Sequence, residues 1–384
     1  MQRKNNSKTI MEENYDNQEE QIQEEITEKE TDKKCPNCGA TVAFDPGSGS
    51  LHCDYCGSSF ELPPPENGSV VDELDFESAV NTESLEWGAA KKSVECKHCG
   101  AVSIYDDLEI AAVCPFCGST QVMPAANENT LAPGGVCPFT VTKETAGEKF
   151  TRWLKRKLFA PRKAKKNAKP ETFKGVYLPY WTYDAQTTNR FIAKAGYDKK
   201  VRKKDGSYET HTTWRSVSGV YQEFFDDETV MASKRMAGSG VSKCEPFDLS
   251  KVIPYDPRAL AGFVAERYSI GLKEGWGIAQ TSIQSKLRSS ISSYIKSHWR
   301  CDRVSSLTFS TLYSNQTYKY ILVPVWLSSF QYNGKTFQFA VNGQTGKVGG
   351  KAPISPIRVI LAILIGLTVL TFFAVILGVL GNIF

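Results

Sequence analysis

The pattern of apolar residues changes most sharply near the C-terminal end of the sequence. About 22 uncharged residues from Val359 onward would form a helix about 33 Å long, against a bilayer hydrocarbon core of about 30 Å. A helix in the core of a soluble protein keeps a polar face, whereas this run is apolar on every face. The pattern therefore predicts a single C-terminal transmembrane helix at residues 357–382.

The charges beside this run predict its orientation. Lys347, Lys351 and Arg358 precede it, whereas the residues that follow it are uncharged. Positively charged flanks of membrane spans usually face the cytoplasm. We therefore expect a single-pass, C-terminally anchored protein of the cell membrane whose N-terminal bulk is cytoplasmic.

Residues 171–350 show the mixed periodicity of an α+β domain. Apolar residues recur at helical spacing from Leu272 to Trp299, which predicts one long helix that packs across a sheet. Runs of β-branched and aromatic residues, bounded by Gly, Asn and Asp, predict an antiparallel sheet. We expect residues 343–347 to form a hairpin turn rather than a phosphate loop. The predicted strands lie at 175–195, 207–232, 303–331 and 335–349.

Two strand-like runs in this domain share a local pattern. Tyr177–Trp181 and Leu322–Trp326 both read apolar, apolar, Pro, apolar, Trp, which indicates two related halves of the sheet. Tyr180, Tyr183 and Trp214 could form an aromatic groove, but aromatic residues in strands usually pack in the core or on the sheet. We expect these three side chains in the core.

Residues 140–170 predict a basic amphipathic helix followed by a linker. Thr142 or Thr145 can cap the helix, apolar residues recur at helical spacing after it, and Pro161 ends it. Nine Lys or Arg residues and no acidic residue lie between positions 152 and 169. The helix should therefore have one apolar face and one basic face.

Three interpretations of this basic segment are open. Near a membrane, each cation can add about 1 kcal/mol of attraction to anionic lipid, and the aromatic face could insert. The cations could instead bind nucleic-acid phosphates, or form a solvated face whose apolar stripe packs on the neighbouring domain. Of the functional interpretations we favour lipid, because the predicted anchor brings a bilayer close. The membrane-surface candidates are Arg152, Trp153, Lys155, Arg156, Lys157, Arg162, Lys163, Lys165 and Lys166.

Two segments are too polar to form a core. Residues 1–33 are rich in Glu, Gln, Asn and Lys and contain no signal-peptide core, so we expect a disordered acidic leader. Residues 63–94 begin with a proline run and continue with acidic residues, as an acidic linker does. The net charge of +4 over 384 residues therefore averages acidic segments with a basic one.

Eight of the eleven cysteines form two sets of C-x-x-C pairs. In each set fourteen residues separate the two pairs, and a glycine follows every pair, which indicates an internal duplication. We expect two small rubredoxin-like zinc ribbons at residues 34–62 and 95–123. Their predicted metal ligands are Cys35, Cys38, Cys53 and Cys56 in the first ribbon and Cys96, Cys99, Cys114 and Cys117 in the second.

The spacing of these cysteines is typical of structural zinc sites. Four thiolates about 2.3 Å from the metal fill a tetrahedral coordination sphere and leave no open position for catalysis. The glycine after each pair suits a turn with positive φ whose N–H groups point at sulfur. We therefore expect two structural zinc ions and reduced cysteines, with iron–sulfur clusters or disulfides as alternatives. The remaining Cys137, Cys244 and Cys301 show no pairing pattern and are expected to be buried thiols.

The composition of the predicted ribbons favours a protein ligand over nucleic acid. Residues 35–62 contain no Lys or Arg, and the second ribbon contains only Lys97. Nucleic-acid binding needs clustered cations that contact phosphates. The sequence also contains no H-E-x-x-H motif, no phosphate loop and no spacing that supports a paired nucleophile and base. No enzyme, catalytic residue or small-molecule substrate is therefore predicted.

The chain after Thr31 resembles bacterial TFIIB-type zinc-ribbon membrane proteins. The resemblance lies in the CPNCG…CDYCGS and CKHCG…CPFCGS ribbons, in KGVYLPYWTYDA, and in VPVWLSSFQYNGKTFQFAVNGQTGKVGG with the terminal span. Such proteins are often labelled primosomal or helicase-like because of the ribbon, but the sequence resembles no helicase motor. The resemblance implies association with flotillin-like (SPFH) membrane proteins. Many relatives have one ribbon rather than two.

These features predict a multidomain, non-enzymatic scaffold or adaptor tethered to the membrane. Its ribbons would hold a cytosolic or membrane protein partner. The alternative is a membrane-attached nucleic-acid-binding protein that uses residues 152–169. A third hypothesis is an enzyme whose site is assembled from dispersed residues of 172–350.

Overall fold

The computed structural model describes eleven stretches of the chain. The predicted leader at 1–33, most of the predicted linker at 63–94 and residues 162–170 of the basic segment lie outside them. The described residues are 34–62, 71–78, 91–97, 101–106, 114–115, 122–124, 131–161, 173–204, 206–236, 240–332 and 335–381.

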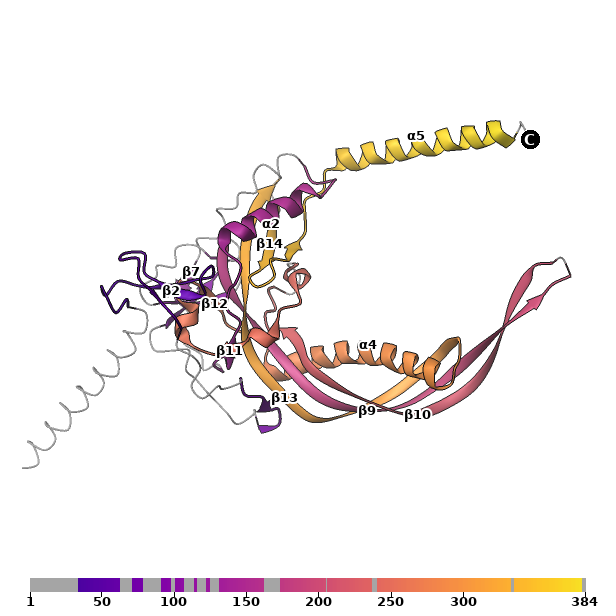
Figure 1. Cartoon of the computed structure of the whole chain (residues 1–384), viewed down its shortest axis with the longest axis horizontal. Helices are drawn as coiled ribbons and strands as arrows, with labels where there is room; N and C mark the ends of the chain where they lie inside the picture. Colours follow the sequence, from indigo (N-terminus) through magenta and orange to yellow (C-terminus); the bar gives the residue numbers. More distant parts are fainter. Residues whose placement is uncertain are drawn as a thin grey trace, which may run out of the picture.

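Three long antiparallel strands form the centre of the fold. β9 (Lys174–Arg202) lies between β10 (Tyr208–Met231) and β13 (Arg303–Tyr332). Valine, threonine and aromatic residues are frequent in all three strands, and these residue types favour an extended backbone. Figure 1 shows that the strands curve together and that β9 and β10 continue as a projecting arm. The predicted antiparallel sheet is therefore confirmed.

β9 is longer than the sequence pattern predicted. The prediction ended at residue 195, whereas pairing with β10 continues to Arg202, which lies opposite Tyr208. The additional residues are mostly charged and do not alternate between apolar and polar side chains. Only their cross-strand pairing defines them as a strand, so periodicity alone could not find them.

One long helix lies on the concave side of the curved sheet (Figure 1). α4 (Leu272–His298) begins at the predicted residue and ends one residue before the predicted end. Its buried side chains form one stripe at helical spacing and pack in the main core with residues of β9 and β10. The stripe consists of Trp276, Ala279, Ile283, Leu287, Ile291 and Ile295.

The two Pro-Trp segments are antiparallel neighbours in the ladder between β9 and β13. Both of their indoles are buried. Trp181 Nε1 donates to the carbonyl oxygen of Ile270 at 2.8 Å, and Trp326 Nε1 donates to that of Val141 at 2.7 Å. In each segment, therefore, the indole holds a neighbouring stretch of chain against the sheet.

One of the three aromatic residues predicted for the core is exposed. Tyr180 and Tyr183 are buried, but Trp214 is 43% exposed. Its indole lies over Gly196, where a Cβ would come within 2.8 Å of the ring. The prediction was wrong for Trp214 because alternation along β10 turns Val217 toward the core and Trp214 toward the opposite face.

Short strands complete the sheet. β14 (Lys335–Asn342) pairs with β13 and with β15 (Val348–Gly350), and Gly346 in the turn between β14 and β15 has a φ of +70°. The predicted hairpin turn at 343–347 is therefore confirmed. β12 with β9 and β8 with β13 are parallel pairs. The other short elements are β4 (Leu74–Asp75), β8 (Gly135–Val136), β11 (Ile253–Pro254), β12 (Val264–Glu266), η4 (Val241–Cys244), η5 (Leu249–Lys251) and η6 (Pro257–Leu260).

The predicted basic amphipathic helix is α2 (Lys143–Lys155). Thr142 caps it, because its Oγ1 accepts a hydrogen bond from the N–H of Thr145 at 3.3 Å. The buried ring of Phe150 packs against Phe339 of β14, with ring centroids 4.8 Å apart. The apolar stripe of α2 is therefore used for packing on the sheet domain.

The two cysteine-rich segments join the rest of the structure differently. The first forms a separate three-stranded sheet. The second extends the main sheet, because β6 pairs with β12. The described strands of the second segment therefore share one sheet with the predicted α+β domain. The strands are β1 (Ala43–Asp45), β2 (Ser50–His52) and β3 (Ser59–Phe60) in the first segment and β5 (Lys91–Cys96), β6 (Val102–Asp106) and β7 (Val122–Pro124) in the second.

Part of the predicted acidic linker lies against the sheet. β4 pairs with β13, with Leu74 opposite Tyr318. The ring of Phe76 packs against Trp276 of α4, with centroids 5.7 Å apart. At least this part of the segment is therefore a fixed element of the fold.

α5 (Pro356–Gly381) stands away from the rest of the structure in Figure 1. The helix is long and apolar enough to cross a membrane, and none of Pro356–Phe373 is buried against the protein. Its 26 residues give a length of about 39 Å at 1.5 Å per residue. Such a large exposed apolar surface is unusual for a soluble monomer.

Candidate metal centre and membrane-proximal surface

Two tight turns present the four cysteines of the first segment. The N–H of Cys35 donates to the carbonyl oxygen five residues later at 2.6 Å, and Cys53 makes the same bond at 2.9 Å. Gly39 and Gly57, which follow the cysteine pairs, have φ of +72° and +74°. Residues with a Cβ rarely adopt this conformation. The predicted positive φ is therefore confirmed at both glycines.

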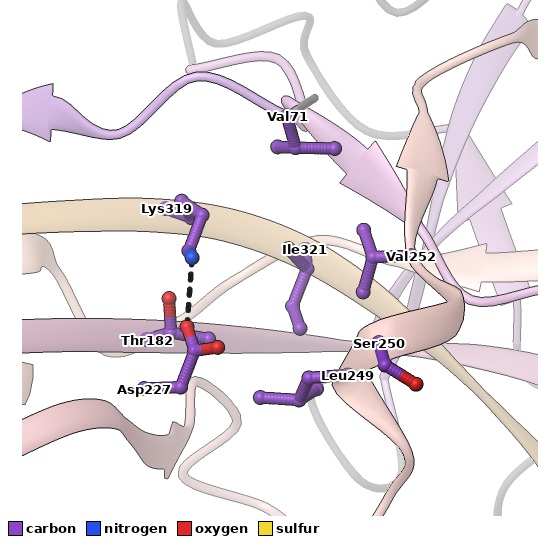
Figure 2. Close-up of a pocket in the computed structure, with 8 residues that line it drawn as sticks. All are labelled: Val71, Thr182, Asp227, Leu249, Ser250, Val252, Lys319 and Ile321. Atoms are coloured by element: carbon purple, nitrogen blue, oxygen red, sulfur yellow. Dashed lines mark ion pairs between the residues drawn. The ribbon is translucent and has the colours of Figure 1, made fainter. Parts of the chain in front are cut away.

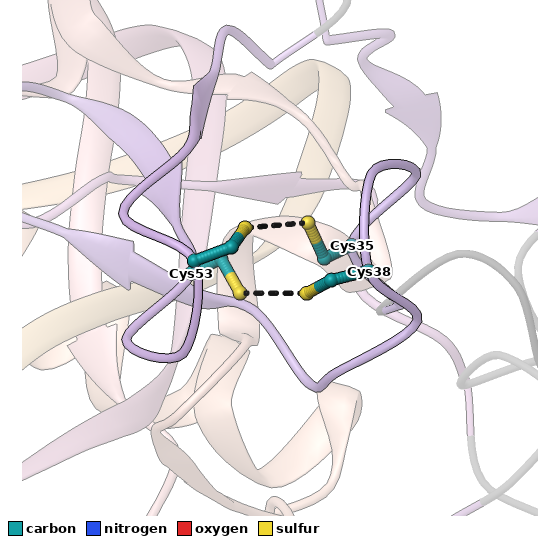
Figure 3. Close-up of side chains that lie close together, drawn as sticks. Cys35, Cys38 and Cys53 are labelled. Atoms are coloured by element: carbon teal, nitrogen blue, oxygen red, sulfur yellow. Dashed lines mark hydrogen bonds between the residues drawn. The ribbon is translucent and has the colours of Figure 1, made fainter.

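The four sulfurs of this segment lie close together, as Figure 3 shows for Cys35, Cys38 and Cys53. Cys35 Sγ lies 3.5 Å from Cys56 Sγ, and Cys38 Sγ lies 3.6 Å from Cys53 Sγ. All four sulfurs lie within 4.8 Å of one another. A disulfide would join two sulfurs at about 2.05 Å, whereas thiolates at about 2.3 Å from a zinc ion lie about 3.8 Å apart. The cluster could therefore hold a zinc ion.

Hydrogen bonds within the two turns support metal binding. The hydroxyl and the backbone N–H of Ser58 lower the pKa of the Cys56 thiol to about 6. At Cys38 the N–H of Ala40 lowers the pKa of the thiol, but burial and the three neighbouring thiols raise it to about 12, so these hydrogen bonds favour the thiolate at Cys56 alone. Asn37 Nδ2 donates to Ser58 Oγ at 2.9 Å and so links the first turn to the second. Metals bind thiolates rather than thiols, so a lowered pKa favours the ligand form. A bound zinc ion would stabilise the fold of the first cysteine-rich segment, which has little hydrophobic core of its own.

The inner half of the centre is packed on the sheet domain. Cys35 and Cys53 are buried and belong to the main hydrophobic core. Phe44 of β1 is buried in the same core, and its N–H donates to the carbonyl oxygen of Ala261 at 3.1 Å. The position of the metal centre is therefore fixed relative to the sheet.

The outer half of the centre faces solvent. Cys38 and Cys56 are exposed. Tyr55, which lies in the turn between two ligands, is 83% exposed. The second turn therefore presents an aromatic side chain at the surface, between two of the four clustered cysteines.

Half of the second predicted ligand set lies among the described residues. Cys96 and Cys114 are buried. The N–H of Cys96 donates to the carbonyl oxygen of Ala101 at 2.8 Å, which is the bond that opens both turns of the first set. Cys99 and Cys117 lie outside the described residues. A second zinc site therefore stays a prediction.

The three cysteines outside the two sets are buried, as predicted. Burial raises the pKa of the Cys137 thiol and of the Cys244 thiol to about 12. Thiols with such raised pKa values are poor nucleophiles at neutral pH.

The described cations of the predicted membrane surface are exposed on α2 and on the turn after it. Trp153 is half-buried, with its ring against Phe339 and the Lys157 ammonium 4.7 Å from the ring centroid. The aromatic face of the helix therefore packs on protein. The exposed cations are Arg152, Lys155, Arg156 and Lys157, whereas Arg162, Lys163, Lys165 and Lys166 lie outside the described residues.

The end of this basic segment contacts the start of the apolar helix. Leu158 is 79% exposed, and the Phe159 carbonyl accepts a hydrogen bond from the N–H of Ser355 at 2.9 Å. Arg358 Nη1 donates to the carbonyl oxygens of Leu158 (3.1 Å) and Ala160 (2.6 Å). Exposed cations, exposed apolar side chains and the first turn of α5 therefore meet in one region, which we call the α2–α5 junction.

A pocket on the convex side of the long strands was not anticipated from the sequence. Its volume is about 230 Å³, and Figure 2 shows Lys319 paired with Asp227 at its polar end. Lys319 Nζ lies 2.8 Å from Asp227 Oδ1 and 3.3 Å from Glu73 Oε1. Thr182 Oγ1 is buried there without a hydrogen-bond partner among the described residues. The apolar walls are Val71, Leu249, Val252 and Ile321.

Three carboxylates lie close together beside this pocket, and their arrangement does not require a metal ion. One oxygen from each of Glu73, Asp184 and Asp226 lies within 4.8 Å of the others. Asp184 accepts hydrogen bonds from the N–H of Asp227 (2.6 Å) and from the hydroxyl of Thr317 (2.8 Å), next to irregularities in both neighbouring strands. Its carboxylate therefore satisfies groups that the bulges leave unpaired. The Lys319 ammonium already supplies a positive charge there, which disfavours a divalent cation.

Comparison with known proteins finds a similarity that covers most of the chain. The "Uncharacterized protein YdjG" of Bacillus subtilis (strain 168) is 31% identical over 333 residues, which is 84% of this chain and 90% of that protein. No protein-family model matches the sequence. No solved structure matches it either.

Proposed function

The chain belongs to the same family as YdjG of Bacillus subtilis, and we propose that it is a membrane-anchored zinc-ribbon adaptor that recruits protein partners to the cell membrane. In this proposal α5 spans the bilayer once and the rest of the chain is cytoplasmic. The observation that carries the proposal is the α2–α5 junction, where Arg358 joins the exposed apolar helix to the exposed basic segment.

The exposure of α5 supports the proposed anchor. No described element covers Pro356–Phe373, so in water this helix would expose a large hydrophobic surface, which a bilayer would bury instead. The cations of the α2–α5 junction would then lie at the level of the lipid headgroups. Each exposed cation near an anionic surface contributes about 1 kcal/mol of attraction. The basic segment therefore acts as a second, electrostatic component of the anchor.

The adaptor surface is assigned to the cysteine-rich segments. A metal ion held by four thiolates has no open coordination position, so its role is to hold the shape of the turns. We propose two rubredoxin-like ribbons with one structural zinc ion each, ligated by the eight predicted cysteines. The first ribbon has no Lys or Arg between Cys35 and Leu62 and presents Tyr55 to solvent. Tyrosine is enriched at protein–protein hot spots, which favours a protein partner.

The partner is proposed from the sequence resemblance described above. It is a membrane protein of the flotillin-like class, which would be recruited through the ribbons. A cytosolic protein of other type would also satisfy the adaptor function. Nucleic acid is the competing ligand, through the basic segment rather than through the ribbons.

Proximity labelling in cells tests this function. A biotin ligase fused at the N-terminus of the full chain should label a defined set of membrane proteins. Cys53→Ser, which removes one ligand of the first centre, should lose part of this set, because the turns would no longer hold their shape. Cys301→Ser is the matched control, since Cys301 is buried outside both cysteine sets.

The outcomes distinguish the candidate functions. An identical set of labelled proteins for Cys53→Ser and wild type would contradict a role of the first ribbon in recruitment. Salt-sensitive co-purification of nucleic acid, abolished when Arg152, Lys155 and Arg156 are replaced by Gln, would support the nucleic-acid alternative. A chain found in the soluble fraction of the cell would contradict the anchor.

A further inference from the structure

The pocket at Lys319 is built on the convex face of the central strands. Lys319 of β13 and Thr182 of β9 lie directly opposite each other in the ladder, so their side chains share one face of the sheet. Ile321 lies two residues further along β13 and therefore points to the same side. These three residues form the sheet side of the pocket (Figure 2).

A bulge in β10 adds a carboxylate to the pocket. The register of β10 against β9 shifts between Phe225 and Glu228, which leaves Asp227 outside the regular pairing. The φ of Asp227 is +50°, a left-handed conformation that residues with a Cβ rarely adopt. Bulges re-aim side chains and are frequent beside active sites. Here the bulge brings the Asp227 carboxylate to Lys319, whose Nζ lies 2.8 Å from Asp227 Oδ1.

Segments from elsewhere in the chain supply the apolar walls. Leu249 is the first residue of η5, Val252 follows the end of η5, and Val71 precedes β4. With Ile321, all four of these side chains are aliphatic. Ser250 adds a hydroxyl, which donates to Asp248 Oδ1 at 2.6 Å. The pocket therefore combines an aliphatic wall with one charged end.

The volume of the pocket limits its ligand to a small molecule. An engineered apolar cavity of about 150 Å³ accepts benzene. A volume of about 230 Å³ therefore has room for a molecule of about eight to ten non-hydrogen atoms. Pockets for drug-sized ligands are larger, at about 300–1,000 Å³.

The charged end favours an uncharged ligand. Burial lowers the pKa of the Lys319 ammonium, but nearby carboxylates, Asp227 foremost, raise it above its ordinary value of 10.5, so Lys319 is charged at neutral pH. Asp227 and Glu73 balance this charge, with oxygens 2.8 Å and 3.3 Å from Lys319 Nζ. An anionic ligand would meet these carboxylates without a cation of its own, and a cationic ligand would meet the ammonium.

A hydroxyl group fits the hydrogen-bonding groups that remain. An ammonium has three donors, and Asp227 and Glu73 account for two of those of Lys319. Thr182 Oγ1 is buried and has no hydrogen-bond partner within the part of the chain that the structure describes. Buried polar groups nearly always have a partner. A ligand hydroxyl can both accept and donate, so one such group would serve Lys319 and Thr182 together.

We propose that the pocket binds a small, uncharged aliphatic alcohol whose hydroxyl lies between Lys319 and Thr182. Its carbon atoms would lie against Leu249, Val252 and Ile321. None of the residues that line the pocket belongs to the cysteine-rich segments or to the α2–α5 junction, so this site does not depend on the proposed anchor or adaptor. A bound alcohol would join η5 to the central strands and stabilise the folded state as its concentration rises.

A titration of the full-length chain in nanodiscs tests this site. The probe is 2-methylpentane-2,4-diol, which is uncharged, branched and of the expected size, and its binding is followed by saturation-transfer difference NMR. Empty nanodiscs give the background. We expect saturable binding of the diol. We expect roughly tenfold weaker binding of 4-methylpentanoate and of 4-methylpentan-1-amine, which have a similar carbon chain but carry a charge.

Thr182→Val removes the buried hydroxyl and nearly keeps the shape of the side chain. We expect this variant to bind the diol roughly tenfold more weakly than wild type. Without the diol it should unfold at the same or a higher temperature, because the hydroxyl without a partner is gone. Thr188→Val is the matched control: Thr188 lies on the same face of β9 outside the pocket, and its hydroxyl accepts a hydrogen bond from Gln222 Nε2 at 3.1 Å.

A second variant tests the pocket without changing its polar groups. Val252 is a half-buried wall residue, and Val252→Phe should fill part of the volume and abolish binding of the diol. Wild-type binding in this variant would contradict the site. Absence of saturable binding to wild type would leave ordered water as the occupant and contradict the proposal. Equal affinities of Thr182→Val and Thr188→Val, or tighter binding of either charged probe than of the diol, would also contradict it.

Discussion

Arg358 and Ala160 are joined by a hydrogen bond of 2.6 Å from Nη1 of the arginine to the carbonyl oxygen of the alanine. The same nitrogen also reaches the carbonyl oxygen of Leu158 at 3.1 Å. One guanidinium therefore satisfies two carbonyl groups in the turn that follows α2. This bond links the first turn of α5 to the body of the protein across a large separation in sequence.

Replacing Arg358 should loosen this link without unfolding the sheet. We expect Arg358→Ala to speed amide hydrogen exchange at Ser355, whose N–H donates to Phe159 in the same region, by a factor that corresponds to about 1–3 kcal/mol. Hydrogen exchange with mass spectrometry in detergent would measure it. Arg358→Lys is the control, because it keeps the charge beside the apolar helix but cannot reproduce the planar guanidinium. Unchanged exchange in Arg358→Ala would show that the bonds are not formed in solution.

The metal content of the chain should follow its cysteines. We expect two zinc ions per wild-type chain and one per chain in Cys53→Ser or in Cys96→Ser, because each loss opens one four-thiolate site. Elemental analysis by mass spectrometry of the purified full-length protein measures this. The control variant Cys301→Ser should retain two zinc ions per chain. Wild-type protein with one zinc ion would contradict the second site, and protein with none would contradict both.

Two glycines of α4 allow a matched test of how closely this helix packs on the sheet. A Cβ at Gly275 would overlap the Tyr183 hydroxyl and come within 2.9 Å of Trp181 Cδ1, whereas a Cβ at Gly277 would meet no atom within 4 Å. Gly277→Ala should be neutral or stabilising by up to about 1 kcal/mol, because alanine favours helix.

In contrast, Gly275→Ala should destabilise by about 1–3 kcal/mol, because overlap in a packed core forces side chains or backbone to shift. Thermal unfolding in detergent, followed by tryptophan fluorescence, would compare the two. The Tyr183 hydroxyl donates to the carbonyl oxygen of Leu272 at 2.7 Å, so this bond should be disturbed in the first variant only. Equal unfolding temperatures would contradict the close approach of α4 to β9.

Glu266 of β12 should make stability depend on pH. Its carboxylate is buried, lies 3.0 Å from Arg235 Nη2 and accepts a hydrogen bond from Ser233 at 2.9 Å. Burial raises the pKa of Glu266 above its ordinary value of 4.5. The folded state therefore binds this proton more readily than the unfolded chain. The contribution of Glu266 to the free energy of unfolding is then fully present below about pH 4.5 and is lost as the pH rises through the folded-state pKa.

The variant Glu266→Gln removes this titration. We expect its unfolding temperature to change less than that of wild type as the pH rises above about 4.5, the ordinary pKa of a glutamate. Glu274→Gln is the matched control, because Glu274 forms an exposed ion pair with Lys234 at 2.9 Å. If the unfolding temperatures of wild type and Glu266→Gln showed the same pH dependence, groups other than Glu266 would be its cause and the prediction would be wrong.

Features that depend on neighbouring residues could be predicted from the sequence. The stripe of α4 from Trp276 to Ile295 repeats every three or four residues, so helix and buried face followed directly from it. The positive φ at Gly39 and Gly57 followed from the position of glycine after each cysteine pair. The apolar run of α5 needed only its length and composition.

Features that depend on distant pairing could not be predicted in the same way. The charged end of β9 is a strand only because β10 lies beside it. The pairing of Ile104 in β6 with Ala265 in β12 joins the second cysteine-rich segment to the main sheet, although nothing in either segment specifies the other. The pocket at Lys319 likewise depends on residues of five separate segments. Sequence spacing predicted the cluster of four cysteines in the first segment but not the surfaces around it.

The central position of β9 has a consequence for biosynthesis. Its partner β10 follows immediately, whereas β13 begins about 70 residues after β10 ends, a delay of roughly 4–14 s at typical translation rates. During that interval one edge of β9 is open to pairing with other chains. The strand that closes this edge is followed closely by α5, so completion of the sheet and emergence of the apolar helix fall in the same short period of synthesis. A chain in which β13 pairs slowly would therefore expose the open edge and the apolar helix at the same time, and both surfaces favour aggregation.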